Sequence, residues 1–169
     1  MRRVHIIGRK NSGKTTLIVE LVHYFVARGL KVGTIKHTHH QHELDTPGKD
    51  SHRHRVAGAS VVGILSGNLT AAFVPCDPDL PRERRYDILA PLYETCNLVL
   101  VEGDMQSHAP RVEVWRSATG QEPIAAKEPG VAAVISDEPV AVPVKRLPKS
   151  DLAAIAAFLL SLVNQSDRT

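Results

Sequence analysis

The 169-residue sequence predicts an α/β fold, a three-layer sandwich with a mostly parallel central sheet and an antiparallel hairpin or edge extension. An apolar run at residues 4–7 leads through a glycine-rich turn into an amphipathic helical pattern, and a second strand follows. The runs at 97–103 and 131–137 are apolar without alternation, as in parallel strands buried on both faces. Two shorter strands flank a Ser-Gly-Asn turn at 66–68, which predicts a hairpin. We expect a single domain over residues 1–169.

The first half of the chain predicts two strands around a helix, then a polar loop and the hairpin. Gly29 stands where a helix commonly ends, just past its last turn. A strand–helix–strand unit with so short a crossover implies parallel strands and a right-handed connection. Ser51 is expected to cap a short helix after the polar loop. The expected elements are a strand at 3–7, a helix at 14–28, a strand at 31–36, a helix at 51–57 and strands at 60–65 and 69–74.

The second half begins with a proline-rich, charged linker and then returns to strands. Pro91 interrupts one helical pattern, because proline removes a helix hydrogen bond. The alternating segment at 111–116 is expected to be half exposed, at an edge of the sheet. Ser150 is expected to cap the closing helix. The expected elements are a linker at 75–85, a helix at 86–94, strands at 97–103, 111–116, 131–137 and 141–147, and a helix at 151–163.

The turn after the first strand, Gly8-Arg9-Lys10-Asn11-Ser12-Gly13-Lys14-Thr15, matches the phosphate-loop motif G-x-x-x-x-G-K-[ST] between a strand and a helix. Its glycines let backbone N–H groups approach phosphate oxygens, and the helix N-terminus faces the same anion. Lys14 is expected to reach the β- and γ-phosphates, and the Thr15 hydroxyl to bind Mg²⁺. The fold is then expected to be that of P-loop nucleoside triphosphatases. The predicted nucleotide-binding residues of this segment are Gly8, Asn11, Ser12, Gly13, Lys14, Thr15 and Thr16.

An acid ends the apolar strand at 97–103. Glu102 follows four apolar residues, as the second acidic motif of such nucleotidases does. It is expected to hold Mg²⁺ directly or through water, or to orient a water molecule for attack. The alternative is an ordinary carboxylate at a strand end. Because ligands of open α/β sheets bind beyond the carboxyl ends of the strands, we expect Glu102 to face the phosphate loop.

The segment at 36–55 is polar and holds six of the nine histidines. Long loops in compact domains are usually functional or disordered. Asp45 and Asp50 are candidates for a second carboxylate near the metal, Asp45 in catalysis and Asp50 as a metal ligand, in a loop that a γ-phosphate would order. The alternative is that Asp45 caps a turn and Asp50 faces water. Lys36 and Lys49 are candidate phosphate contacts.

The histidines at 37, 39, 40 and 42 are close enough in the sequence to share a Zn²⁺ or Ni²⁺ ion. Paired cysteines do not accompany them, so a solvated loop that contacts phosphate or a partner is the simpler interpretation. Farther along, Asp137 follows a buried strand and is a candidate acceptor for hydrogen bonds from the base edge of guanine. The alternative is that Asp137 caps the turn before Pro139.

Composition bounds the function class. The formal net charge of +3 is mildly basic and is not by itself a signature of nucleic-acid binding. The two cysteines, Cys76 and Cys96, are too few and too far apart for a disulfide framework or a zinc motif, which indicates free thiols in a reducing compartment. Apolar runs stay far below the ~20 residues of a membrane span, and the N-terminus lacks a signal-peptide pattern. We therefore expect a cytoplasmic protein.

Taken together, these segments resemble the molybdopterin-guanine dinucleotide biosynthesis protein B family. The likeness covers most of the chain in order and spacing. The phosphate loop alone indicates only a P-loop nucleotidase, whereas the histidine and Pro-Gly-Lys-Asp-Ser segments point to the narrower family. The matching segments are 8–15, 36–40, 45–51, 57–59 and 101–103.

The resemblance implies a GTP-binding protein, often a homodimer, with weak Mg²⁺-dependent GTPase activity. It implies a role in assisting the guanylyltransferase that attaches GMP to molybdopterin. It also implies that Gly13, Lys14 and Thr15 hold the phosphates and Mg²⁺, with Glu102 as the second acid. The family usually continues with Phe-Lys after Glu-Gly, whereas Asp104-Met105 stands here, so the role of that lysine is not carried over.

We expect slow hydrolysis of GTP to GDP and phosphate, because the sequence shows no clear general base or arginine finger. Arg53 or Arg55 would have to act across a dimer to supply one. Two other functions fit the motifs. One is a small-molecule kinase, which needs an acceptor pocket beside the γ-phosphate, and the other is a nickel- or zinc-delivery GTPase that uses the histidines. A scaffold that binds nucleotide without hydrolysing it is a further alternative.

Overall fold

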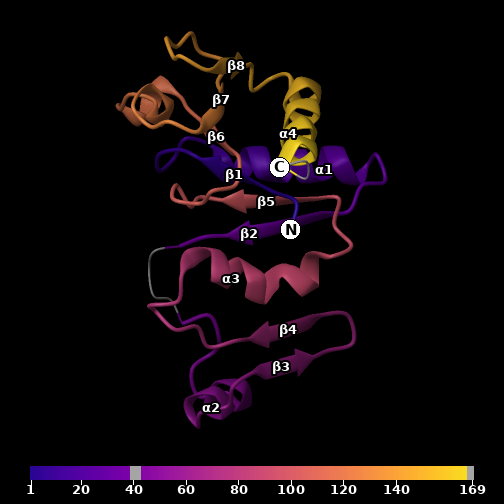
Figure 1. Cartoon of the computed structure of the whole chain (residues 1–169). Coiled ribbons are helices and arrows are strands. Elements are labelled where there is room, and N and C mark those ends of the chain that lie inside the picture. Colours follow the sequence, from indigo (N-terminus) through magenta and orange to yellow (C-terminus); the bar gives the residue numbers. More distant parts are fainter. Residues whose placement is uncertain (39–42, 167–169) are drawn as a thin grey trace. The chain divides into compact units, whose positions relative to one another are not determined.

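The computed structural model describes residues 1–38 and 43–166. The chain divides into two compact units, one of residues 1–38 with 87–169 and one of residues 39–86 (Figure 1). Each unit is described by itself below. The α/β fold class is confirmed, whereas the single domain expected over 1–169 stays a prediction.

The first unit is built on a parallel sheet. Its strands lie in the order β2-β5-β1-β6-β7-β8, and every neighbouring pair is parallel. β1 and β2 are therefore parallel as expected, but β5 lies between them. The elements are β1 (Arg3–Ile7), α1 (Lys14–Val26), β2 (Val32–Lys36), η1 (Ala90–Tyr93), β5 (Leu98–Glu102), β6 (Arg111–Val114), η2 (Ser117–Thr119), η3 (Ile124–Ala126), β7 (Val131–Ile135), β8 (Lys145–Leu147) and α4 (Leu152–Ser166).

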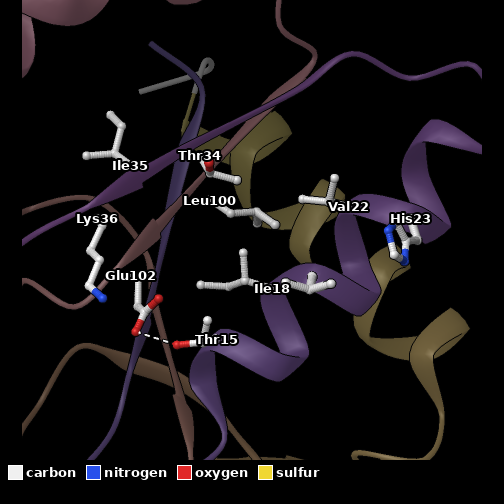
Figure 2. A pocket seen from close by; sticks show the side chains of 10 residues that line it. Thr15, Ile18, Val22, His23, Thr34, Ile35, Lys36, Leu100 and Glu102 are labelled. Carbon is white, nitrogen blue, oxygen red and sulfur yellow. Dashed lines mark hydrogen bonds between the residues drawn. The ribbon is translucent and has the colours of Figure 1, made fainter.

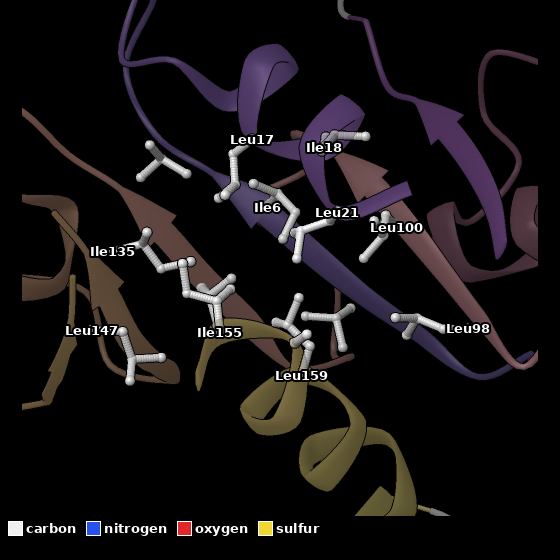
Figure 3. Packing of buried hydrophobic residues seen from close by; sticks show 14 of the residues in the cluster. Ile6, Leu17, Ile18, Leu21, Leu98, Leu100, Ile135, Leu147, Ile155 and Leu159 are labelled. Atoms are coloured by element: carbon white, nitrogen blue, oxygen red, sulfur yellow. The ribbon is translucent and has the colours of Figure 1, made fainter. Parts of the chain in front are cut away.

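Two apolar clusters hold this sheet. Helices α1 and α4 contact each other and pack their apolar residues on one face of the sheet, as Figure 3 shows for Leu17, Leu21 and Leu159. A smaller cluster joins Ile7 of β1 to η3 and β7. Because a parallel sheet needs apolar cover on both faces, the non-alternating strands predicted at 97–103 and 131–137 belong in its interior.

The end of α1 follows the expected glycine signal. Gly29 has φ +75°, its N–H donates to the Val26 carbonyl at 2.9 Å, and the Leu30 N–H donates to the Phe25 carbonyl at 3.1 Å. This is the Schellman arrangement, in which the left-handed residue is usually glycine.

The second unit contains α2 (Asp50–Val56) and a hairpin of β3 (Val62–Leu65) and β4 (Thr70–Phe73). The predicted hairpin is confirmed, since its strands are antiparallel and the Ser66 N–H donates to the Leu69 carbonyl at 2.9 Å. α3 (Arg82–Leu89) contains the boundary between the units, at residues 86 and 87.

The edge position predicted for 111–116 is wrong. β6 lies between β1 and β7, and Val112, Glu113 and Val114 are buried. The alternation came from Glu113, whose carboxylate accepts hydrogen bonds from the backbone N–H groups of Ile124 and Ala125, each at 2.8 Å. Burial raises the pKa of Glu113, while these two bonds act to lower it. From the sequence alone, a buried acid whose carboxylate accepts backbone hydrogen bonds cannot be told apart from an acid that faces solvent.

The predicted linker at 75–85 is too long. α3 begins at Arg82, directly after Pro81, whose carbonyl accepts the Arg84 N–H at 2.9 Å. The helix expected at 86–94 ends at Leu89, and the residues around Pro91 form the separate 3-10 turn η1.

Both predicted serine caps are also wrong. Ser51 lies inside α2 and its hydroxyl donates to Asp45 Oδ1 at 3.0 Å. At α4 the capping residue is Asp151, whose Oδ1 accepts the Ala154 N–H at 2.9 Å. The Ser150 hydroxyl donates instead to Asp137.

The helices of the described ranges, 1–38 and 43–166, include none that has both the length and the hydropathy to cross a bilayer.

Candidate nucleotide site

The carboxyl ends of the parallel strands meet at one edge of the sheet, where ligands of open α/β sheets bind. A polar group ends each of the six strands or follows it within two residues. These groups are the phosphate loop after β1, Lys36 at the end of β2, Glu102 at the end of β5, Arg116 after β6, Asp137 after β7 and Lys149 after β8.

The phosphate loop has the strained backbone that its glycines permit. Gly8 has φ +144° and Gly13, the residue before α1, has φ +98°. A β-carbon on Gly8 would lie 2.4 Å from the carbonyl oxygen of Val114, so β6 and the loop approach each other too closely for any side chain there. Asn11 is also left-handed, at φ +63°. The Ser12 hydroxyl is buried and has no hydrogen-bond partner among the described residues.

The Lys14 ammonium lies over the loop. Its Nζ donates to the carbonyl oxygens of Gly8 at 2.9 Å and Arg9 at 2.8 Å. Burial lowers the pKa of Lys14, Glu102 acts to raise it, and the neighbouring Lys36 acts to lower it. These neutral carbonyls are weaker acceptors for an ammonium than phosphate oxygens are, so an incoming polyphosphate can take over the bonds.

Thr15 and Glu102 meet, as the sequence predicts. The Thr15 hydroxyl donates to Glu102 Oε1 at 2.9 Å (Figure 2). Lys36 lies beside Glu102 in the register of β2 and β5. Hydroxyl and carboxylate oxygens are the ligands that Mg²⁺ prefers, and adjacent ligands of an octahedral Mg²⁺ at ~2.0–2.1 Å lie about 2.9 Å apart. The two oxygens therefore have the spacing of neighbouring magnesium ligands.

A pocket of about 530 Å³ opens at the phosphate loop. Three cationic side chains line it, and Glu102 is the only acid among its lining residues. Such an excess of positive charge at a helix N-terminus favours a polyanion. The lining residues are Lys10, Asn11, Gly13, Lys14, Thr15, Thr16, Glu102 and Arg116.

A second pocket of about 410 Å³ lies next to the first, between α1 and β2, and the two share Thr15 and Glu102. Its walls are mostly apolar, with Ile18 and Leu100 among them, and Lys36 also lines it (Figure 2).

The turn after Glu102 carries the departure from the resembled family. Gly103 and Asp104 are both left-handed, at φ +89° and +60°. Asp104 is buried, and its carboxylate accepts the Gln106 N–H at 3.3 Å, so it braces this turn. His5, buried in β1, donates to the Gly103 carbonyl at 3.2 Å. The turn is thus held without the Phe-Lys pair.

Asp137 is bound to the segment that precedes α4. Its Oδ1 accepts the backbone N–H of Ser150 at 2.8 Å and the Ser150 hydroxyl at 2.9 Å. These bonds hold the pKa of Asp137 below its usual value. The following turn is closed by Ser136, whose hydroxyl accepts the Glu138 N–H, so the predicted capping role of Asp137 is wrong. Its contact with a guanine base stays a prediction.

Three predicted site residues belong to the second unit. Asp45 Oδ1 accepts the Thr46 N–H at 2.7 Å and the Ser51 hydroxyl, so Asp45 stabilises a turn, as the alternative interpretation held. Lys49 precedes α2, and the Asp50 side chain is 91% exposed. Their roles toward a nucleotide stay predictions.

The histidines at 39, 40 and 42 lie outside the described residues. Within 1–38 and 43–166, no three His, Cys, Asp or Glu side chains are grouped as a metal site would require.

Arg116 and Lys149 were not predicted as site residues. Both follow strands at the binding edge of the sheet, which is the signal that marked Glu102 and Asp137. Arg116 was overlooked because its strand was assigned to an exposed edge. Lys149 lies between the last expected strand, at 141–147, and the expected capping serine, Ser150, and no motif marks it.

An open parallel sheet, a glycine-rich loop between its first strand and first helix, and an acid on the neighbouring strand define the class: α/β proteins with a P-loop-like fold. Residues 3–137 match the family model described as Molybdopterin guanine dinucleotide synthesis protein B. The chain therefore belongs to this family.

Individual relatives agree with the family match. The chain is similar to the molybdopterin-guanine dinucleotide biosynthesis adapter protein of Escherichia coli, at 33% identity over 92% of this chain and 90% of that protein. The adapter protein of Haemophilus influenzae is 33% identical over 91% of this chain and 85% of its own length. A crystal structure of a MobB protein homologue from Bacillus stearothermophilus has a TM-score of 0.66 and 26% identity, and covers 98% of this chain and 99% of that one.

Proposed function

We propose that this protein is a GTP-binding adapter of molybdopterin-guanine dinucleotide biosynthesis, with slow Mg²⁺-dependent hydrolysis of GTP to GDP and phosphate. The biosynthetic role is supported by the family match and by the names of the relatives. The observation that carries the nucleotide site is the 2.9 Å contact between the Thr15 hydroxyl and Glu102 beside the phosphate loop.

The proposal assigns to each residue of the site its own contact with the triphosphate or with Mg²⁺. Lys14 exchanges its bonds to the Gly8 and Arg9 carbonyls for bonds to the β- and γ-phosphates. Thr15 and Glu102 hold Mg²⁺, which neutralises charge on these phosphates when it is bound. Thr16, Asn11 and the backbone N–H groups at the start of α1 complete the cradle.

Hydrolysis is expected to be slow. The candidate base Asp45 accepts hydrogen bonds from Thr46 and Ser51 through Oδ1, and its Oδ2 is buried, so neither oxygen is exposed to an attacking water molecule. Arg116 lines the phosphate pocket and is the candidate cation for the γ-phosphate, although its side chain is exposed to water. A single-turnover rate typical of efficient enzymes would contradict this part of the proposal.

Calorimetry of the Lys14→Ala variant tests the site. The variant cannot make the bonds that the proposal assigns to Lys14 on the β- and γ-phosphates, each worth roughly 1.5–3 kcal/mol, so GTP affinity should fall at least about 100-fold. Lys31→Ala removes an exposed lysine from the residue before β2 and is the matched control. Equal GTP affinity in Lys14→Ala and Lys31→Ala would contradict the proposal that GTP binds at the phosphate loop.

A homodimer is part of the proposal. An isolated two-stranded hairpin is only marginally stable in water, and no further strand pairs with β3 or β4 among the described residues. The hairpin also exposes apolar side chains, including Leu65 at 83% and Leu69 at 68%. Exposed apolar groups of this kind mark interfaces. Sedimentation should show dimers that Leu65→Glu dissociates and that Leu92→Glu, a 72% exposed leucine outside the hairpin, leaves intact.

We further propose the cytoplasm as the site of action, the guanylyltransferase of the pathway as the partner enzyme and molybdopterin as a second ligand. Both cysteines are free thiols, which agrees with a reducing compartment. Pull-down of the guanylyltransferase with the wild-type protein, with and without GTP, tests the partnership.

A small-molecule kinase is the second candidate, and the 410 Å³ pocket beside Thr15 and Glu102 favours it, because a kinase needs room for an acceptor there. Nucleotide-dependent phosphorylation of a metabolite, lost in Val22→Trp, would establish it. Val26→Trp is the control, since Val26 is 57% exposed on the same helix and does not line the pocket. The adapter proposal expects no phosphorylated metabolite.

A further inference from the structure

The phosphate pocket is lined by three separate pieces of the chain. Besides residues of the phosphate loop and the start of α1, its lining contains Glu102 at the end of β5 and Arg116 two residues after β6. β5 and β6 are the two neighbours of β1, so Glu102 and Arg116 approach the loop from opposite sides. Two spacings of about 4.8 Å place their strands roughly 10 Å apart. A polyphosphate in the loop therefore lies between the proposed metal ligand and a guanidinium.

Arg116 is the one cationic lining residue that comes from outside the phosphate loop and α1. Its side chain is exposed, and within residues 1–38 and 43–166 its guanidinium makes no hydrogen bond or ion pair. A guanidinium presents a planar fork of donors that matches two oxygens of one phosphate. Unlike Lys14, which must first release two carbonyls, Arg116 can take a phosphate without breaking a contact of its own.

The backbone is held on both sides of Arg116. The Trp115 N–H donates to a carbonyl of β7 at 3.1 Å. The Arg116 carbonyl accepts the Thr119 hydroxyl at 2.9 Å and the Thr119 N–H at 3.2 Å. The Ser117 N–H donates to Glu138 Oε2 at 3.0 Å. The residue that carries the guanidinium is thus fixed at the mouth of the pocket.

Glu138 is in turn fixed through its own backbone, just beyond β7. Its N–H donates to the buried Ser136 hydroxyl at 3.1 Å, and its carbonyl accepts the Arg146 guanidinium at 3.2 Å. Hydrogen bonds from the Ser117 hydroxyl and N–H, with a contribution from the Arg116 charge, hold the pKa of Glu138 below its usual value. The carboxylate is therefore ionised near neutral pH and ties the start of η2 to the end of β7.

We propose that Arg116 is a polyphosphate-binding residue supplied by the loop after β6, and that Glu138 is a positioning residue that acts through Arg116. The inference rests on the proposed function, since it takes the phosphate loop as the site of the triphosphate. Because the backbone at Arg116 is ordered before the ligand binds, less conformational entropy is lost on binding. An arginine from a second subunit, such as Arg53 or Arg55, is then not required.

Calorimetric titration with Mg²⁺–GTP and with Mg²⁺–tripolyphosphate tests both roles. Arg116→Met should weaken both ligands roughly 10-fold, because its contact is with phosphate alone. Glu138→Ala should weaken both by roughly 3- to 10-fold, because the start of η2 is released. Glu138→Gln keeps an acceptor for the Ser117 N–H and should bind at least as tightly as wild type. The double variant Arg116→Met/Glu138→Ala should equal Arg116→Met alone, because Glu138 acts only through Arg116.

Lys127→Met and Glu122→Ala are the matched controls for loss of a positive and of a negative charge. The two residues lie on the same segment between β6 and β7, pair with each other at 2.7 Å, and are 75% and 70% exposed. Both variants should bind the two ligands as wild type does. Arg116 is exposed, so Arg116→Met keeps the fold and tests its role even if thermal unfolding shows Glu138→Ala to be unstable.

Four results would overturn the inference. No loss in Arg116→Met, or a loss confined to GTP, removes Arg116 from the phosphates. A loss in Glu138→Gln as large as in Glu138→Ala, or a further loss in the double variant, excludes the positioning role. If Lys14→Ala loses binding while Arg116→Met does not, the inference fails and the proposed function stands. If wild-type protein binds neither ligand, the proposed function fails and the inference with it.

Discussion

Replacing Glu102 with glutamine separates the magnesium-binding role of this residue from its structural role. The Thr15 hydroxyl donates to Glu102 Oε1 at 2.9 Å, and the amide oxygen of glutamine accepts the same bond. The backbone at this point is held independently, because the His37 N–H donates to the Glu102 carbonyl at 3.0 Å. The variant therefore keeps the fold and loses one negative charge.

The size of the effect follows from that charge. Two unit charges 4 Å apart interact by about 4 kcal/mol at an effective dielectric constant of ~20. Glu102 is half-buried, so water screens part of this interaction, and we expect about 2 kcal/mol, or ~30-fold in affinity for the magnesium–GTP complex. Without Mg²⁺ the same change removes repulsion between carboxylate and phosphate, so GTP affinity should stay equal or rise.

The assay is calorimetric titration of GTP with excess Mg²⁺ and with EDTA, on wild-type protein, Glu102→Gln and Glu20→Gln. Glu20 is an exposed acid on α1 and serves as the control. The ratio of the two affinities should fall ~30-fold in Glu102→Gln alone. An unchanged ratio, with normal thermal unfolding, would refute the assignment of Glu102 to the metal.

Three further predictions concern the scaffold of the site. Gly8→Ala should destabilise the fold by roughly 2–5 kcal/mol, measured by urea unfolding, because the new β-carbon meets a backbone oxygen at 2.4 Å on a left-handed residue; Gly67→Ala, in open space, should not. Glu113→Gln should cost about 1–3 kcal/mol by the same measurement, since one of two backbone N–H groups of η3 loses its acceptor. The depressed pKa of Asp137 stabilises the fold above ~3.9, its unfolded value, and this contribution is lost as the pH falls through the folded pKa; thermal unfolding of Asp137→Asn should therefore depend less on pH below about 4 than that of wild type.

Local patterns were sufficient where neighbouring residues set the structure. The phosphate loop, the end of α1 at Gly29 and the hairpin at 66–68 depend on backbone conformations that only a few residue types adopt, so the sequence predicts them directly. The pairing of Thr15 with Glu102 was predictable for a related reason, since parallel strands bring their carboxyl ends to one edge.

Contacts between distant segments decided the rest. Alternation in β6 resembled a solvent-facing strand because the sequence does not show that Glu113 accepts hydrogen bonds from backbone N–H groups eleven and twelve residues later. The cap of α4 was predicted at Ser150, whereas Asp151 provides it, because the sequence does not show that the Ser150 hydroxyl is bound to the distant Asp137.

The amino-acid sequence by itself determined the α/β class, the phosphate loop and the acid that faces it, because each follows from backbone freedom, apolar periodicity and the geometry of parallel strands. Only the tertiary structure decided the strand order and the placement of the Lys149 ammonium beside Gly13, a residue far from it in the sequence. Which side chains of different strands come into contact depends on strand register and layer packing, and both exist only once the layers have assembled.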